Sequence, residues 1–141
     1  MIAVVDTNHL LRLAAAIKRS PLFAAWRAGR FELAISAEIM VELTQVSSRP
    51  KVLRFVPAEN LREFVAFLQT DAVFVTPVTD FPHCRDPKDD MIIATAIAAH
   101  ANFIVTTDLD LLEADLVTQL RDHWQIRVAT PAEFLAVVND G

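Results

Sequence analysis

Residues 2–6 of this chain read IAVVD, four apolar residues followed directly by the carboxylate of Asp6. A short, fully apolar run with β-branched residues is typical of a buried strand in a parallel sheet. A second run, FIVTT at residues 103–107, also leads into an acid, Asp108. In α/β folds, ligands bind beyond the carboxyl ends of the parallel strands. We therefore expect Asp6 and Asp108 to lie at the edge of a sheet where ligands bind.

The rest of the chain alternates short apolar runs with helical segments. Further strands are expected at 73–76, 103–106 and 126–128, and 31–35 fits either a short strand or an extended link. Helices are expected at 9–19, 21–28, 37–47, 58–69, 89–101 and 131–138. This alternation predicts an α/β fold, a three-layer α/β/α sandwich with a mainly parallel central sheet. A length of 141 residues suits a single domain spanning 1–141.

The composition excludes several classes of protein. Only two glycines occur, so phosphate-binding loops that need glycines at fixed spacings are nearly excluded. The single cysteine can form no internal disulfide, and no CxxC pair is present for zinc, which favours a reducing, cytoplasmic setting. No signal peptide is expected, and the longest apolar stretch, at 91–99, is too short to span a membrane.

The charge is unevenly distributed along the chain. The net charge is −5, which argues against a protein that coats nucleic acid. Residues 1–70 carry nine Lys/Arg against six Asp/Glu, a balance of +3, whereas residues 71–141 carry four against twelve, a balance of −8. This asymmetry suits an acidic metal site beside a modestly basic flank. A solvated helical surface with counter-charges explains the basic residues equally well.

Four separated carboxylates are the candidates for such a site: Asp6, Glu42, Asp90 and Asp108. Clustered acids repel one another, since two unit charges ~4 Å apart cost roughly 4 kcal/mol at an effective dielectric constant near 20. A fold that gathers them needs a compensating divalent cation. The pattern therefore indicates metal-dependent chemistry on phosphate.

Each of these acids also has a simpler explanation. Asp6 and Asp108 could cap the helix or turn that follows, and Asp110 could be the ligand in place of Asp108 or a second ligand beside it. Glu42 lies at the edge of the apolar stripe of its helix, where it could form a salt bridge with an arginine. The segment DPKDD at 86–90 offers three acids at a helix start, and periodicity alone selects none of them.

Several segments, in order along nearly the entire chain, resemble the motifs of PIN domains. They are DTN at 6–8 after the leading strand, SAEIMVEL at 36–43, RPK at 49–51, CRDPKDD at 84–90 before an apolar helix, VTTDLD at 105–110 and TPAEFL at 130–135. The resemblance is closest to the small single-domain PIN proteins that are toxin components of toxin–antitoxin modules, the VapC-like group.

This resemblance implies an endoribonuclease that uses Mg²⁺ or Mn²⁺ to cleave single-stranded RNA through metal-activated water. Asp90 is selected because the run DMIIATA at 90–96 matches the acid-led helix of the family. The implied metal-binding and catalytic residues are Asp6, Glu42, Asp90 and Asp108. The side chains implied to orient these ligands or add charge at the rim are Thr7, Asn8, Thr106, Asp86 and Asp110. The chain departs from the family pattern at His9 and at Thr107, where glycine is common, and Thr107 leaves Asp110 open as the fourth ligand.

The partners expected from this resemblance are a single-stranded RNA substrate, a cognate antitoxin protein and a second copy of the chain in a homodimer, with no membrane. Two other functions remain open. One is a non-catalytic PIN-like module whose surface binds a partner protein. The other is an aspartyl-phosphate phosphatase with Asp6 as nucleophile, which is disfavoured because such enzymes typically carry an acid where this chain has Asn8.

Overall fold

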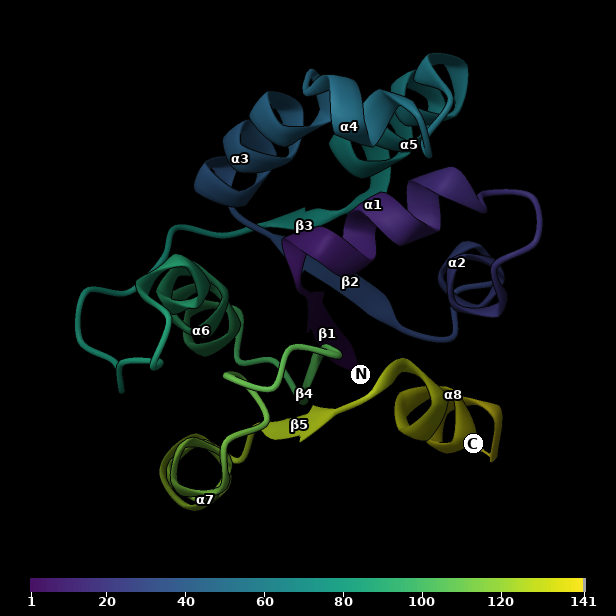
Figure 1. Cartoon of the computed structure of the whole chain (residues 1–141). Helices are drawn as coiled ribbons and strands as arrows, with labels where there is room; N and C mark the ends of the chain where they lie inside the picture. Colours follow the sequence, from purple (N-terminus) through teal and green to yellow (C-terminus); the bar gives the residue numbers. More distant parts are fainter. Residues whose placement is uncertain (141) are drawn as a thin grey trace.

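The computed structural model describes residues 1–140 and contains a five-stranded sheet in the order β3-β2-β1-β4-β5 (Figure 1). Every neighbouring pair of strands is parallel. The strands are β1 (Ile2–Val5), β2 (Glu32–Ile35), β3 (Val73–Phe74), β4 (Phe103–Val105) and β5 (Arg127–Ala129). Gly141, the last residue of the predicted domain, lies outside the described residues.

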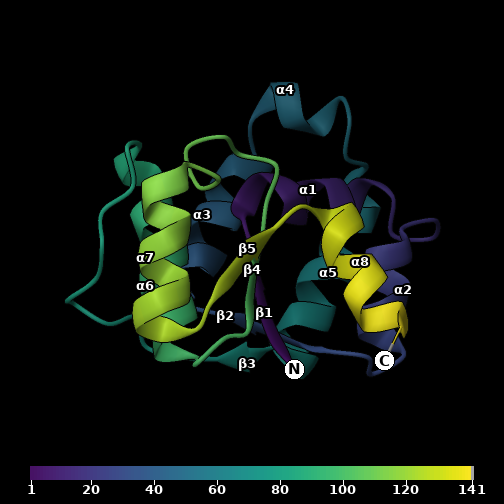
Figure 2. The same ribbon diagram turned by 90° about the horizontal axis from the view of Figure 1, so that it is seen from below.

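Helices pack against both faces of this sheet. They are α1 (Thr7–Ala15), α2 (Pro21–Arg27), α3 (Ala37–Ser47), α4 (Pro50–Leu53), α5 (Ala58–Asp71), α6 (Asp90–Ala98), α7 (Ala114–Trp124) and α8 (Pro131–Asp140), with a 3₁₀ turn η1 (Pro87–Asp89) before α6. Figure 2 shows α6 and α7 on one side of the strands and α2 and α8 on the other. The predicted three-layer α/β/α architecture with a parallel sheet is confirmed.

Burial on both faces explains why the central strands are apolar without alternation. Ala3, Val4 and Val5 of β1 are at most 2% exposed, and every residue of β4 is buried. On the face covered by α8, Phe134 packs edge-on against Phe103 with a distance of 5.1 Å between ring centroids. Such strands can read as continuous apolar runs because neither face meets water.

The strand order reverses beside β1, which makes a topological switch point there. The chain runs outward from β1 to β2 and β3, then returns to the other side of β1 as β4. The register pairs Val5 with Val105, so the residues that follow β1 and β4 emerge at the same level. A crevice at the carboxyl ends of such neighbouring strands is the usual ligand site of open parallel sheets.

The elements differ from the predicted ones mainly in the helices. α4 and α7 were not expected; α7 buries only Leu116 and Leu120, which makes a narrow apolar stripe among polar residues. α1 begins at Thr7, earlier than predicted, because the carboxylate of Asp6 accepts a hydrogen bond from the His9 amide and caps the helix. Within residues 1–140, no helix combines the length and the apolar character needed to cross a bilayer.

Candidate functional site

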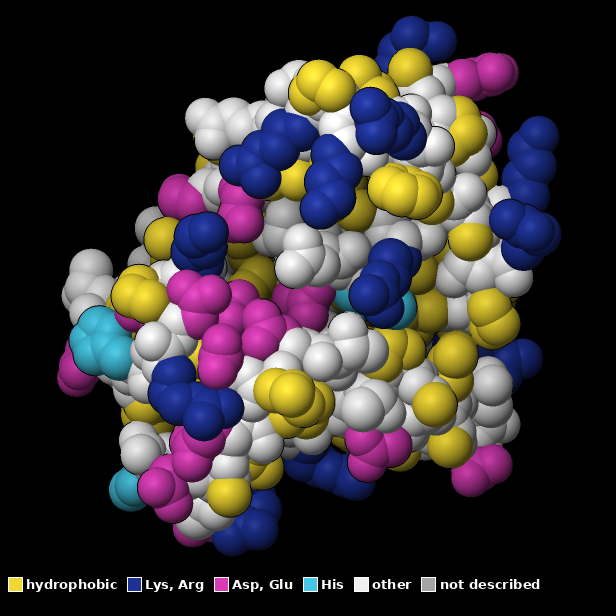
Figure 3. Space-filling view, viewed as in Figure 1, with side chains coloured by type: hydrophobic (Ala, Val, Ile, Leu, Met, Phe, Trp, Pro, Cys, Tyr) yellow, Lys and Arg dark blue, Asp and Glu magenta, His cyan; other side chains and the backbone are white. Residues whose placement is uncertain are grey.

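A hollow of about 460 Å³ lies at the carboxyl ends of β1 and β4. Figure 3 shows acidic side chains gathered near the middle of this face, with lysine and arginine side chains above them. Arg49 and Lys88 also line the hollow, together with Thr7 and Asn8. Its acidic lining residues are Asp6, Glu42, Asp86, Asp89 and Asp108. Residues far apart in the sequence therefore meet at the switch point of the sheet.

Asp6 is held in place by two hydrogen bonds. Its side chain is buried at 5% exposure, and it accepts hydrogen bonds from the His9 amide at 2.7 Å and from the hydroxyl of Thr106. The same hydroxyl accepts a hydrogen bond from the Asp108 amide at 2.9 Å. Thr106 is completely buried, so this single side chain fixes the relative positions of the residues that end β1 and β4.

Asp108 is ordered by the turn that follows β4. Its carboxylate accepts a hydrogen bond from the Asp110 amide at 2.8 Å. Asp110 does not line the hollow but forms an ion pair with Arg85 at 3.2 Å, in a position at the rim. Of the two acids left open by the sequence, Asp108 is the one whose side chain lines the hollow.

Glu42, on α3, also lines the hollow. It is half-buried, as the edge of an apolar stripe predicts, and it forms no ion pair with any residue in the described part of the chain. The salt bridge considered for Glu42 is therefore absent there, and its carboxylate remains available to a cation.

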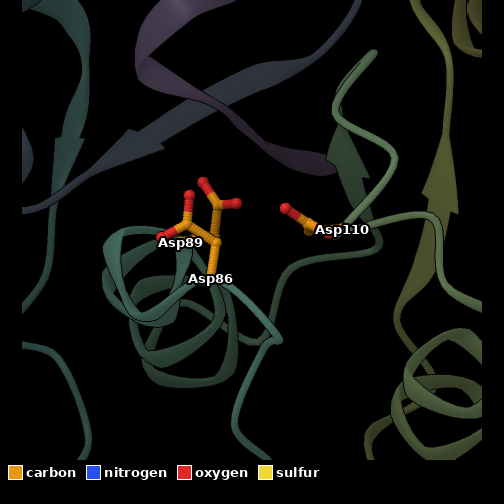
Figure 4. Close-up of side chains that lie close together, drawn as sticks. All are labelled: Asp86, Asp89 and Asp110. Carbon is orange, nitrogen blue, oxygen red and sulfur yellow. The ribbon is translucent and has the colours of Figure 1, made fainter.

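Asp89 carries the clearest electrostatic signature of the site. Partial burial, a hydrogen bond with the Asp108 carboxyl and the nearby charges of Asp108, Asp86 and Asp6 raise the pKa of Asp89 from 3.8 to about 7. Oxygen atoms of Asp86, Asp89 and Asp110 also lie within 4.8 Å of one another (Figure 4). Burial and the close neighbouring carboxylates therefore both favour the protonated form of Asp89.

Asp90 lies outside this cluster, unlike the position implied by the sequence resemblance. Its carboxylate accepts a hydrogen bond from the Cys84 amide at 2.7 Å and contacts Nδ1 of His83 at 2.8 Å. Successive helical residues point about 100° apart, so Asp90 at the start of α6 faces the preceding loop while Asp89 faces the hollow. The structure thus brings together Asp6, Glu42 and Asp108, with Asp89 in place of Asp90.

One signal in the sequence could have distinguished these two acids. Pro87 starts the 3₁₀ turn η1, and Asp86 caps it by accepting a hydrogen bond from the Lys88 amide at 3.1 Å. In a 3₁₀ turn, side chains three residues apart lie on the same side. Asp86 and Asp89 have this spacing, so a turn at Pro87 directs both of them to the hollow.

The donor set fits a divalent cation. Carboxylate oxygens are hard ligands that suit Mg²⁺ and Mn²⁺. Burial first, and then the neighbouring carboxylates of Asp108, Asp86 and Asp6, raise the pKa of Asp89, so the nearby negative charges repel its ionised form. A bound divalent cation would relieve this repulsion, and the carboxylates that could hold it are those that line the hollow, together with Asp110, whose oxygen atom lies within 4.8 Å of those of Asp86 and Asp89.

Comparison with known protein families gives a match to the PIN domain over residues 3–110. The chain belongs to the PIN domain family. The matched range runs from β1 to the turn after β4 and includes every acid of the hollow. A search of curated proteins finds no match for this PIN protein. PIN domains are generally nucleases, so membership and the acidic cluster together indicate a hydrolase with a nuclease-type function.

Replacing Thr106 with Val is expected to weaken the binding of Mn²⁺ by about 10–100-fold, the usual effect of removing a partner that orients a metal ligand. The change removes the hydroxyl that joins Asp6 to Asp108 while keeping a similar shape. Isothermal titration calorimetry measures the affinity, and Thr106→Ser, which keeps the hydroxyl, is the matched control. Equal affinities for Val and Ser would show that this hydroxyl does not position the acids.

Proposed function

We propose that this PIN protein is a metal-dependent endoribonuclease that cleaves single-stranded RNA, and that it is the toxin of a toxin–antitoxin pair. The observation that carries the proposal is the crowded carboxylate cluster at the switch point, in which the pKa of Asp89 is raised to about 7. The metal-holding set is Asp6, Glu42, Asp89 and Asp108. Asp86, which also lines the hollow, and Asp110 at the rim add negative charge.

The side chains around the hollow suit hydrolysis of a phosphodiester by water. Within the described chain, the lining contains no serine, cysteine or histidine that could act as a covalent nucleophile. When bound, a divalent cation supplies positive charge that activates water and stabilises the charge developing on the phosphate. Arg49 and Lys88, which line the same hollow, can bind the phosphates of the RNA backbone.

The toxin assignment rests on the ordered VapC-like motifs rather than on the geometry of the site. It adds three expectations to the proposal: a cognate antitoxin that binds the protein, a homodimer, and action in the cytoplasm. The net charge of −5 fits a protein that selects RNA at one site rather than coating it.

The direct test is cleavage of mixed single-stranded RNA by the purified protein with Mn²⁺, with Mg²⁺ and with EDTA. We expect cleavage with at least one of the cations and none with EDTA. The cation should also raise the melting temperature, because a ligand at 100 times its Kd stabilises the folded state by about 2.7 kcal/mol. Cleavage that persists in EDTA would contradict the metal-dependent mechanism. A cation-induced shift in melting temperature without cleavage of any RNA would favour a PIN-like module that only binds a partner.

A further inference from the structure

A second hollow, of about 550 Å³, continues from the acidic site toward α4. It shares Asp6, Asn8 and Asp108 with the acidic hollow. The remainder of its lining contains no acid and consists of the basic Arg12 and Lys51, the apolar Val52 and Phe55, and the polar Thr107. A single-stranded nucleic acid with one phosphate at the acids can therefore continue directly into the second hollow.

Phe55 is unusual among the aromatic residues of the chain. Its side chain is 71% exposed, whereas most of the other phenylalanines are buried or partly buried in the core. It lies just after α4 on a tight turn, in which the Phe55 and Val56 amides both donate to the Val52 carbonyl at 2.9 Å. The exposed ring lines the second hollow beside Arg12 and Lys51, so it is accessible to a ligand that binds there.

The cations beside Phe55 have no acidic partners. Arg12 and Lys51 line the same hollow, and Arg49 and Arg54 flank α4 in sequence. Over residues 1–140, none of these four side chains takes part in an ion pair. In a protein with a net charge of −5, this cationic strip is complementary to a polyanion.

An aromatic ring next to unpaired cations is the combination that binds single-stranded nucleic acid. Bases stack on the ring and the cations bind the backbone, and the stacking is tolerant of sequence because every base has a π-face. The continuity of this strip with the acidic hollow favours the substrate over a protein as its occupant.

We propose that Phe55 stacks on an unpaired base of the RNA substrate, while Arg12 and Lys51 bind the phosphates between that base and the cleaved bond. This inference rests on the proposed nuclease function and adds how the substrate is held. Phe55 contributes to the affinity for RNA, whereas the acids contribute to cleavage of the phosphodiester bond.

The test measures binding of a fluorescently labelled single-stranded 12-nucleotide RNA with Mg²⁺ present, in an Asp6→Asn background that prevents cleavage. Phe55→Ala is expected to weaken binding about tenfold, within the range measured for single base–aromatic stacks. Phe55→Trp should restore the affinity, whereas Phe55→Leu, which is apolar but has no ring, should not. The matched control is Phe74→Ala, which removes the other strongly exposed phenylalanine, on β3, outside the hollows at the acidic site.

Steady-state kinetics separate the role of Phe55 in binding RNA from the role of the acids in cleaving it. In the otherwise unaltered protein, Phe55→Ala should raise KM about tenfold and leave kcat unchanged. Lys51→Ala should lower the slope of log affinity against log salt by about 0.7, the value for one contact with a single-stranded backbone. Thermal melting of every variant checks that the fold is retained, and Phe55→Leu provides a second variant if the alanine substitution unfolds the protein.

Two results would overturn the inference. One is unchanged RNA affinity in Phe55→Ala, which would leave Phe55 to a docking surface for a protein; the other is full RNA affinity in Phe55→Leu, which would show that apolar contact rather than stacking on a ring holds the RNA. Absence of cleavage by the unaltered protein concerns only the nuclease function, because the binding comparison does not depend on cleavage. The two proposals can therefore fail separately.

Discussion

Asp6→Asn is expected to lower the rate of metal-dependent RNA cleavage by about a thousandfold and to leave the protein folded. A catalytic metal supplies several kcal/mol of stabilisation to the transition state, and about 4 kcal/mol corresponds to a thousandfold in rate. Asp6 is the most deeply buried acid of the hollow. Its replacement removes a negative charge from the hollow at the junction of β1 and β4.

The fold should tolerate this change because Asn can keep the local hydrogen bonds. An asparagine side chain caps helices as well as aspartate does, so its Oδ1 can still accept from the His9 amide, and its Nδ2 amide can donate to the Thr106 hydroxyl oxygen in place of the bond that Asp6 accepts. Cleavage assays and thermal melting in EDTA measure the two effects separately. The control is Asp122→Asn, an exposed acid paired with its neighbour Arg121. An Asp6→Asn protein that unfolds would indicate that Asp6 is needed for structure rather than for chemistry.

The position of Asp6 and Asp108 was predictable because it depends on strands alone. Apolar runs that end at an acid define both the buried strand and the residue at its carboxyl end. The parallel sheet then brings β1 and β4 side by side, with Val5 opposite Val105. The sequence could not show the hydroxyl of Thr106 as the link between the two acids, because this contact spans 100 residues and depends on the register.

Which acid of residues 86–90 faces the hollow was harder to predict, because it depends on the local winding of the backbone. A continuous helix from residue 89 would give Asp89 and Asp90 equivalent places at its start. The structure instead has the 3₁₀ turn η1 followed by α6, and the change in winding there turns Asp89 toward the hollow and Asp90 toward Cys84. Helix boundaries are the least certain part of a reading from sequence, and here one residue changes which carboxylate faces the site.

The neighbouring acids Asp89 and Asp90 therefore provide a sharp comparison. Asp89→Asn is expected to reduce cleavage by about a hundredfold or more, because it removes a carboxylate that lines the hollow. Asp90→Asn is expected to stay within about threefold of the original rate, because an Asn oxygen can still accept from the Cys84 amide. Rates at saturating Mn²⁺ measure both variants. The reverse order of effects would make Asp90 the ligand.

Asp89→Asn should also stabilise the metal-free protein, by an amount that depends on pH. The pKa of Asp89 is raised to about 7 by burial and by its acidic neighbours, so between pH 4 and 7 the folded state holds a proton that the unfolded state has lost. Stability therefore falls as pH rises through this range and stays low above it. The full difference from 3.8 to about 7 corresponds to roughly 4 kcal/mol. Solvent screening of this partly buried group reduces the expected gain from Asp89→Asn to about 1–2 kcal/mol at pH 8, with none at pH 4.

Urea unfolding in EDTA at the two pH values measures this difference, with Asp90→Asn as the control for a neighbouring acid that lies outside the hollow. A divalent cation should reverse the order of stability at pH 8, because it compensates the crowded carboxylates of the original protein and binds the variant more weakly. Equal stability of Asp89→Asn and the original protein at pH 8 in EDTA would mean that the acids do not repel one another in solution. The crowding that indicates a cation site would then be absent.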